Sequence, residues 1–236
     1  MGSETDHQPS ASDVTSWSMI QGAARGDSMD RSAFARRYEA VVRAYFGARW
    51  RNTVHLRSLD DAVQEVFLDC FKEDGALERV VENRQSSFRA FLFGVVRNVA
   101  LRHEDHRRRN RERPAGTESD LEEIPLDETR LSQAFDRAWA RERVREAVAR
   151  QKQLALRQGA KAVRRVELLR RRFYEGLPIR EIAREWQEDP AHLHHQYAHA
   201  RREFREALVQ VMSAHHPGPP EEIERECVFL IGLLRP

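Results

Sequence analysis

Apolar side chains recur every three or four residues through most of this chain, which is the spacing of helices that bury one face. The pattern runs from residue 31 to about residue 113, and it returns from about residue 131 to residue 212. It is clearest at Phe34, Tyr38, Val41, Val42 and Tyr45. No run that alternates β-branched and polar residues predicts a strand. The sequence therefore predicts an all-α fold.

Composition divides this helical chain into two small domains. The stretch "PAGTESDLEEIPLDE" carries two prolines, a glycine and six acids, which is typical of a flexible acidic linker. The first thirty residues are rich in Ser, Asp, Gly and Gln, as disordered segments are. We expect a largely disordered tail at 1–30, a helical domain at 31–114, the acidic linker at 115–133, a second helical domain at 134–216 and an amphipathic helix at 217–236.

Charge is nearly balanced over the chain but uneven along it. There are 40 Lys and Arg against 38 Asp and Glu, which leaves a net charge of +2. Residues 87–113 and 134–216 each carry a positive surplus, and the linker between them is acidic. Two basic blocks indicate two surfaces that meet a polyanion such as nucleic acid.

Two features of the sequence predict a cytoplasmic protein: the placement of its cysteines, and the lack of a recognisable leader or membrane-spanning run. Cys70 and Cys227 lie far apart, each within an apolar helical pattern, so we expect two buried free thiols in a reducing compartment. We see no basic start followed by an apolar leader and no apolar run of the length of a membrane span. No membrane insertion is expected.

The segment 59–72, "LDDAVQEVFLDCFK", predicts an amphipathic helix. Its apolar face contains Val63, Val66, Phe67, Cys70 and Phe71. The opposite face carries Asp61, Gln64, Glu65, Asp69 and Lys72. This second face has two interpretations: an ordinary solvated surface, or a docking surface for a basic partner protein.

The segment 87–113 begins with phenylalanines and ends with arginines. Phe88, Phe91, Leu92, Val95, Val96 and Val99 form the expected buried face. Arg89, Phe93 and Arg97 lie four residues apart on another face, with Asn98 beside them. Capture of a single nucleic-acid strand combines basic side chains for phosphates with aromatic surfaces for bases. Phe93 is open to either reading, as a stacking platform or as an ordinary core aromatic.

The segment 176–208 predicts a helix-turn-helix. Ile179, Ile182, Ala183 and Trp186 mark one face of a short first helix. Asp189 suits the N-cap of the second helix, and Pro190 suits its first position. Leu193, Tyr197, Ala200 and Phe204 mark the inner face of this second helix. The turn lacks the usual glycine.

These three segments together, in this order, resemble the sigma factors of bacterial RNA polymerase, of the extracytoplasmic-function type. "DDAVQEVFLDCF" is similar to the polymerase-binding helix of that family. "SFRAFLFGVVRNVALRH" resembles the region 2 helix that meets the melted upstream promoter element, and "YEGLPIREIAREW" with the following helix resembles the region 4 module that reads the distal element. The resemblance covers residues 31–113 and 134–212. An ordered set of motifs is more specific than one helix-turn-helix.

The resemblance implies a sigma factor that binds core RNA polymerase, recognises a two-element promoter and assists DNA opening. For core polymerase it implicates Asp61, Gln64, Glu65 and Asp69. For the melted element it implicates Phe93, Arg97, Asn98, Arg102, Arg107, Arg108, Arg109 and Arg111. For the distal element it implicates His192, His194, His195, Gln196, His199, Arg201 and Arg202. An anti-sigma protein is a further expected partner.

The sequence departs from the family pattern at several positions. Phe91 stands in place of the family's tryptophan, and Glu104 and Asp105 interrupt the basic run. On the reading helix, His194 and Gln196 replace the usual basic residues. Neutral histidine carries no full charge near pH 7. Arg201, Arg202 and Arg205 can compensate by holding the DNA backbone.

Two rival functions remain open, and neither is enzymatic. One rival is a helix-turn-helix regulator that acts without being a polymerase subunit, and the other is an adaptor that binds acidic proteins or RNA. "HEDH" at 103–106 places its histidines three apart, whereas a zinc protease motif needs four. His192, His195 and His199 share a face but lack cysteine or acidic ligands at metal spacing. We expect no catalysis, no metal and no cofactor.

The last helical stripe runs through Ile223, Cys227, Leu230, Ile231 and Leu234. A helix of this length is marginal alone in water, so the stripe needs a partner surface. We expect it to dock on the second domain of the same chain, and the alternative is a separate regulator.

Overall fold

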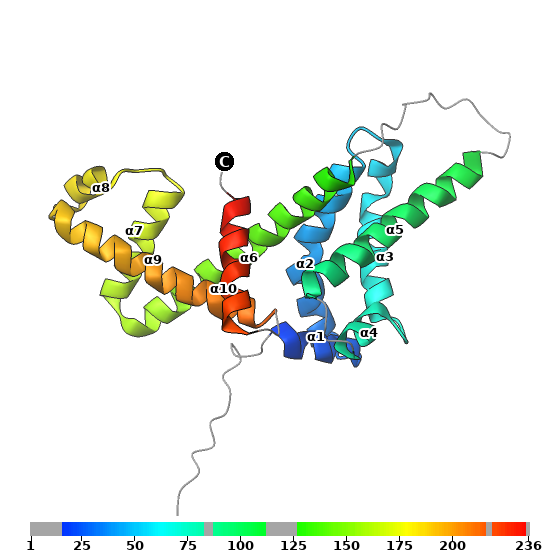
Figure 1. Ribbon diagram of the computed structural model, residues 1–236, viewed down its shortest axis with the longest axis horizontal. Coiled ribbons are helices and arrows are strands. Elements are labelled where there is room, and N and C mark those ends of the chain that lie inside the picture. Colours follow the sequence, from blue (N-terminus) through cyan, green and yellow to red (C-terminus); the bar gives the residue numbers. More distant parts are fainter. Residues whose placement is uncertain (1–15, 83–86, 112–126, 216–218, 235–236) are drawn as a thin grey trace, which may run out of the picture. The chain divides into compact units, whose positions relative to one another are not determined.

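The computed structural model describes residues 16–82, 87–111, 127–215 and 219–234, and every regular element in these ranges is helical. The prediction of an all-α fold is confirmed (Figure 1). In chain order the helices are α1 (Ser16–Ala24), α2 (Ser28–Arg49), the 3-10 helix η1 (Val54–Ser58), α3 (Leu59–Phe71), α4 (Ala76–Glu82), α5 (Phe88–Arg111), α6 (Glu128–Gln158), α7 (Ala160–Phe173), α8 (Ile179–Trp186), α9 (Pro190–Ser213) and α10 (Pro220–Leu233).

The chain divides into two compact units. Unit 1 contains residues 1–142 with the short stretches 214–217 and 233–236, and unit 2 contains residues 143–213 and 218–232. The division falls inside α6, whereas the sequence placed it in an acidic linker at 115–133. Helix α6 already begins at Glu128, because Leu131, Phe135 and Trp139 on its first half are buried in unit 1. Residues 112–126 lie outside the described residues.

Unit 1 has a core of aromatic rings around α2. Phe34 and Tyr38 of α2 meet Phe88 of α5 at ring-centroid distances of 5.9 and 5.1 Å. Trp139 of α6 stacks on Tyr38 at 5.8 Å with the two planes 10° apart. These rings exclude water and bury more apolar area than aliphatic side chains do, so they fix how α5 and α6 lie against α2.

Helix α1 corrects the expectation that residues 1–30 are largely disordered. Met19, Ile20 and Ala23 are buried, and α1 packs against α2 and α4 (Figure 1). Arg31 ties the elements together, because its guanidinium donates to the carbonyls of Ala23 and Phe71 at the ends of α1 and α3. The stretch is polar in composition, which favoured the prediction of disorder. A short run within it nevertheless has apolar side chains at helical spacing, and this was sufficient for a helix. Residues 1–15 lie outside the described residues.

A partly buried ion pair joins the end of α2 to the middle of α5. Arg49 donates two hydrogen bonds to Glu104, at 2.6 and 2.8 Å, and the indole of Trp50 donates a third at 2.8 Å. Burial alone would raise the pKa of Glu104, but these hydrogen bonds outweigh it and hold the pKa below its ordinary value. Glu104 is therefore a structural carboxylate that faces the core of unit 1.

In unit 2, α8 and α9 are joined by a short turn within the segment 176–208. Helices α7, α8 and α9 enclose a core of Leu168, Ile179, Ile182, Ala183 and Leu193, with Leu177, Trp186 and Tyr197 packed against it. Arg164 of α7 covers the ring of Trp186 at 4.3 Å and pairs with Glu188 at 2.6 Å. The apolar faces predicted for both helices of the motif are confirmed at these positions.

The turn between α8 and α9 uses a glutamine where a glycine is usual. Gln187 has φ 55° and ψ 41°, which is the left-handed region that favours glycine. Its N–H and that of Glu188 bond back to carbonyls at the end of α8. Asp189 then caps α9, because its carboxylate accepts the N–H of His192 at 2.9 Å.

Helix α10 follows the predicted stripe only in part. Ile223, Cys227 and Leu230 are buried, and residues 218–232 belong to unit 2. Ile231 is exposed instead, beside exposed Val228 and Phe229.

Burial raises the pKa of the Cys227 thiol to about 11 and that of Cys70 to about 12, so both are inert thiols. Among the described helices, none is long and apolar enough to span a membrane.

The ion pair at Glu104 gives a pH-dependent prediction. Glu104→Gln should lower the free energy of unfolding at pH 7 by about 1–3 kcal/mol, because the hydrogen bonds from Arg49 and Trp50 lose a charged acceptor. The folded-state pKa is depressed, so this stabilisation is complete above the unfolded value of about 4.3 and is lost as the pH falls through the lower folded value.

Urea unfolding of both forms between pH 2 and pH 7 measures this difference. Exposed Glu73 supplies the matched control, since Glu73→Gln makes the same change at a site where no such contact exists. A difference between wild type and Glu104→Gln that persists below pH 3 would show that the effect is not ionisation.

The left-handed turn gives a second prediction. Gln187→Gly should raise the local stability of α8 and α9 by about 0.5–1 kcal/mol, because glycine adopts a positive φ without steric cost. Hydrogen exchange of the α8 and α9 amides measures the change in full-length protein. Gln187→Ala keeps the β-carbon and should bring no gain. An equal gain from alanine would mean that the side chain, and not the backbone, is the source of strain.

Candidate nucleic-acid interface

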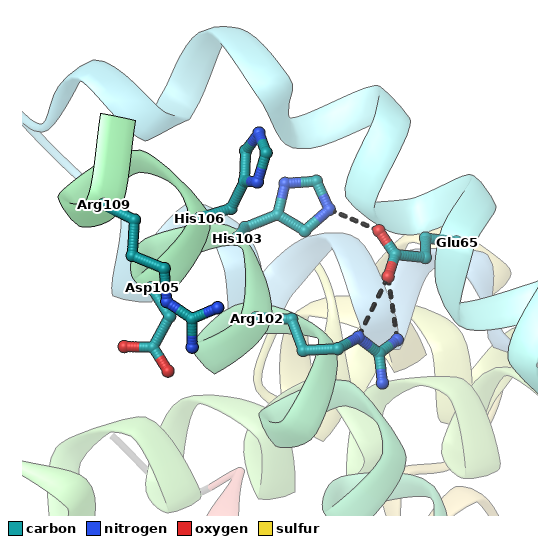
Figure 2. Close-up of a pocket in the computed structure, with 6 residues that line it drawn as sticks. All are labelled: Glu65, Arg102, His103, Asp105, His106 and Arg109. Carbon is teal, nitrogen blue, oxygen red and sulfur yellow. Dashed lines mark hydrogen bonds and ion pairs between the residues drawn. The ribbon is translucent and has the colours of Figure 1, made fainter. Parts of the chain in front are cut away.

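An acid–base cluster joins α3 to α5 (Figure 2). Glu65 accepts two hydrogen bonds from Arg102, at 3.1 and 2.8 Å, and Arg102 also bridges to Asp69. The Nε2 atom of His103 lies 2.6 Å from the other oxygen of Glu65. The cluster borders an open hollow of about 560 Å³ that His106 and Arg109 also line. Figure 2 shows Arg102 and His103 pointing toward Glu65, with Asp105 directed away from it.

The cluster brings together residues that the sequence assigned to two different surfaces. Glu65 and Asp69 were expected to meet core polymerase, and Arg102 was expected to meet DNA. Burial alone would raise the pKa of Asp69, but hydrogen bonds from Lys72 and Arg102 hold it below its ordinary value. The ionised form of Asp69 is therefore favoured, and the acidic side chains of the cluster pair with Arg102 within unit 1.

The remainder of the polar face of α3 is open to solvent. Asp61 and Gln64 are exposed, and neither takes part in the acid–base cluster. Leu68 lies one turn beyond Gln64 and is 61% exposed. Leu68 thus adds an exposed apolar side chain to this polar face, and sequence reasoning did not single it out. The signal was available, because positions 61, 64 and 68 share one face of the helix.

The face of α5 that was expected to hold a melted strand is partly covered by α6. The ring of Phe93 meets Tyr45 at 5.7 Å and Phe135 at 5.3 Å, both edge to face. Arg97 pairs with Glu128 at 3.3 Å. Phe93 is therefore packed as a half-buried aromatic in this structure, whereas the neighbouring Asn98 is exposed.

The basic end of α5 remains accessible beyond this covered face. Arg108 and Arg109 are exposed and Arg107 is half-buried. Arg108 pairs with Asp105 one turn earlier, at 3.0 Å. Glu104 does not interrupt this surface, since it faces the core of unit 1 and is held there by Arg49. Arg111 belongs to α5, but its side chain lies outside the described ones.

Helix α9 presents the side chains that were expected to read the distal element. His192, His194, His195, Arg201 and Arg202 are exposed, whereas Gln196 and His199 are half-buried. His199 lies 3.3 Å from Glu203, which in turn is held by Arg165 of α7. His199 is thus directed toward an ion pair of unit 2, and the other residues form an open face. In the described part of the chain, no three His, Cys, Asp or Glu side chains gather as a metal site would require.

Comparison with protein-family models gives no match for this chain, and comparison with curated proteins gives none either. The assignment of function therefore depends on the motifs and on the geometry described above.

Proposed function

We propose that this protein is a sigma factor of the extracytoplasmic-function type, which binds core RNA polymerase, recognises a two-element promoter and assists DNA opening in the cytoplasm. The observation that carries the proposal is the exposed face of α9 on a well-packed helix-turn-helix. Its capped N-terminus, its exposed histidines and its exposed arginines suit the docking of a recognition helix into a major groove.

The two halves of this α9 face suit different contacts with DNA. His194 and His195 lie near the N-terminus of the helix, where side chains of a recognition helix contact base edges. Arg201 and Arg202 lie two turns further along, at a place suited to phosphate. Base contacts specify and phosphate contacts position, so the helix carries both functions in one exposed stripe.

In unit 1 the proposal assigns core polymerase to the open part of α3 and phosphates to the end of α5. Asp61, Gln64 and Leu68 combine a charge, an amide and an apolar anchor on one surface. Arg108 and Arg109 extend a positive surface from the same unit. No catalytic step is assigned to this chain, because the polymerase performs the chemistry.

A helix-turn-helix regulator that acts without polymerase is the second candidate. The observation that favours it is the pairing of Glu65 and Asp69 with Arg102, which leaves fewer free acids for a basic partner. Gel shift with promoter duplex separates the two candidates. A sigma factor should bind duplex poorly alone and specifically with core polymerase, whereas an independent regulator should bind equally well in both cases.

The α3 surface gives a prediction about polymerase. Asp61→Arg combined with Leu68→Ala should weaken association with core polymerase about tenfold or more, because the change removes an anchor and reverses a charge on one surface. Leu156→Ala is the matched control, since Leu156 on α6 is 62% exposed. Circular dichroism checks that helix content is unchanged. Undiminished affinity for core polymerase would remove this surface from the proposal.

The α9 face gives a prediction about DNA. Alanine at His194, His195 and Gln196 should reduce discrimination between distal-element sequences, at about 1–3 kcal/mol for each well-made base contact. Alanine at Arg201 and Arg202 should weaken all sequences alike and flatten the salt dependence by about one unit of slope each. Fluorescence anisotropy of the complex with core polymerase, measured at several salt concentrations, separates the two effects. The reverse pattern would mean that the helix lies in another register.

A further inference from the structure

We infer that the first half of α6, residues 128–139, is an internal competitor for the nucleic-acid face of α5. The inference rests on the proposed function, since it takes Phe93 and Arg97 as side chains that contact the melted strand and adds Arg89, which lies on the same face of α5. In this structure all three contact α6 instead. A strand that contacts all three in place of these partners must displace α6 from them.

The two helices meet in a matched antiparallel register. Arg97 pairs with Glu128, and eight residues earlier on α5 Arg89 pairs with Asp136, eight residues later on α6. Eight residues of helix span about 12 Å, so the two carboxylates have the same spacing as the two guanidinium groups. Phe93, midway between the arginines, meets Phe135 at 5.3 Å.

Helix α6 presents to α5 the same kinds of chemical group as the single strand that it would exclude. A single strand offers phosphates to arginines and a flat base to an aromatic ring. Helix α6 offers two carboxylates to the same arginines and a phenyl ring to the same phenylalanine. Each contact is exchanged for one of the same kind, so a strand meets no uncompensated charge when it takes the place of α6.

The strength of the contact differs along α6. At its first turn the Arg97–Glu128 pair is solvent-exposed, and such pairs are weak and screened by salt. Two turns later Phe135 and Trp139 are buried, and the Arg89–Asp136 pair beside them is much less exposed. Displacement should therefore begin at Glu128 and should extend through the contact of Phe135 with Phe93, while Trp139 stays stacked on Tyr38.

The test uses full-length protein in which both carboxylates are neutralised, as Glu128→Gln with Asp136→Asn. The probe is a fluorescein-labelled single-stranded DNA of mixed sequence, and anisotropy gives its affinity. We expect binding to strengthen roughly fivefold or more at low salt, with a salt slope steeper by about 1.4, because two arginines become available to phosphates. Adding Arg97→Ala should remove most of the gain. Glu128→Gln alone tests the same idea without changing the aromatic contacts, although it also removes the charge that Glu128 presents to Arg49 at 3.4 Å.

A matched control removes two negative charges elsewhere in unit 1. Glu39 and Asp60 both pair with Arg43, at 2.8 and 2.6 Å, so Glu39→Gln with Asp60→Asn changes the net charge equally and also frees an arginine. Binding of this variant should stay within about twofold of wild type, since one freed arginine away from α5 adds at most one phosphate contact. An equal gain in the control would overturn the inference and leave only general electrostatics.

Hydrogen exchange supplies the second measurement. Addition of the single strand to wild-type protein should raise the exchange of amides in residues 128–142 while leaving α9 unchanged. Unchanged exchange in α6, or unchanged affinity of the double variant, would overturn the inference even if promoter-specific transcription with core polymerase succeeds. The converse result, displacement of α6 without any transcription, would support the inference and count against the sigma-factor proposal.

Discussion

The stack of Tyr38 on Trp139 is the contact on which the arrangement of unit 1 depends. It joins α2 to α6, and Phe34 and Phe88 extend the same cluster to the start of α5. Because these rings are large and stiff, they fix the rotation of α5 about its own axis. That rotation turns Glu104 toward Arg49 and the core, Phe93 toward α6, and Arg102 toward α3.

Once α5 is fixed in this way, its charges divide into two groups. The arginines along its first four turns or so meet carboxylates of α3 and α6, so they are neutralised within the unit. Arg108 and Arg109 near its end extend past these partners and are exposed. A chain with a net charge of only +2 can therefore still present a concentrated positive surface. Its acids pair with particular arginines and do not neutralise all of the arginines equally.

Periodicity in the sequence predicted which positions are buried but not which helices they meet. It located the apolar faces of α3, α5, α8 and α9, and local chemistry identified Asp189 as the cap of α9, since each of these features depends on residues within a few turns. The pairing of Glu65 with Arg102 joins residues 37 positions apart, and no local pattern reports such a contact. For the same reason the start of α6 was predicted as part of a linker. Its acids are typical of a solvated segment, and the contacts that stabilise the helix, those of Phe135 and Trp139 with rings of α2 and α5, join residues far apart in the sequence.

The outcome of the proposed competition between α6 and a nucleic-acid strand depends on the number of contacts that the strand makes as well as on their chemistry. Because α6 is part of the same chain, its carboxylates act at the high effective concentration of a tethered ligand, and a short strand that meets only Arg89 and Arg97 gains little by replacing them. A longer strand also reaches the exposed arginines at the end of α5, and a promoter adds the contacts of α9. Each further phosphate contact adds to the counterion release that drives binding, whereas the contact made by α6 is fixed. Under the proposed function, exchange is favoured only when several basic surfaces are engaged together, and the face of α5 that α6 contacts would then discriminate between an extended promoter and an isolated strand.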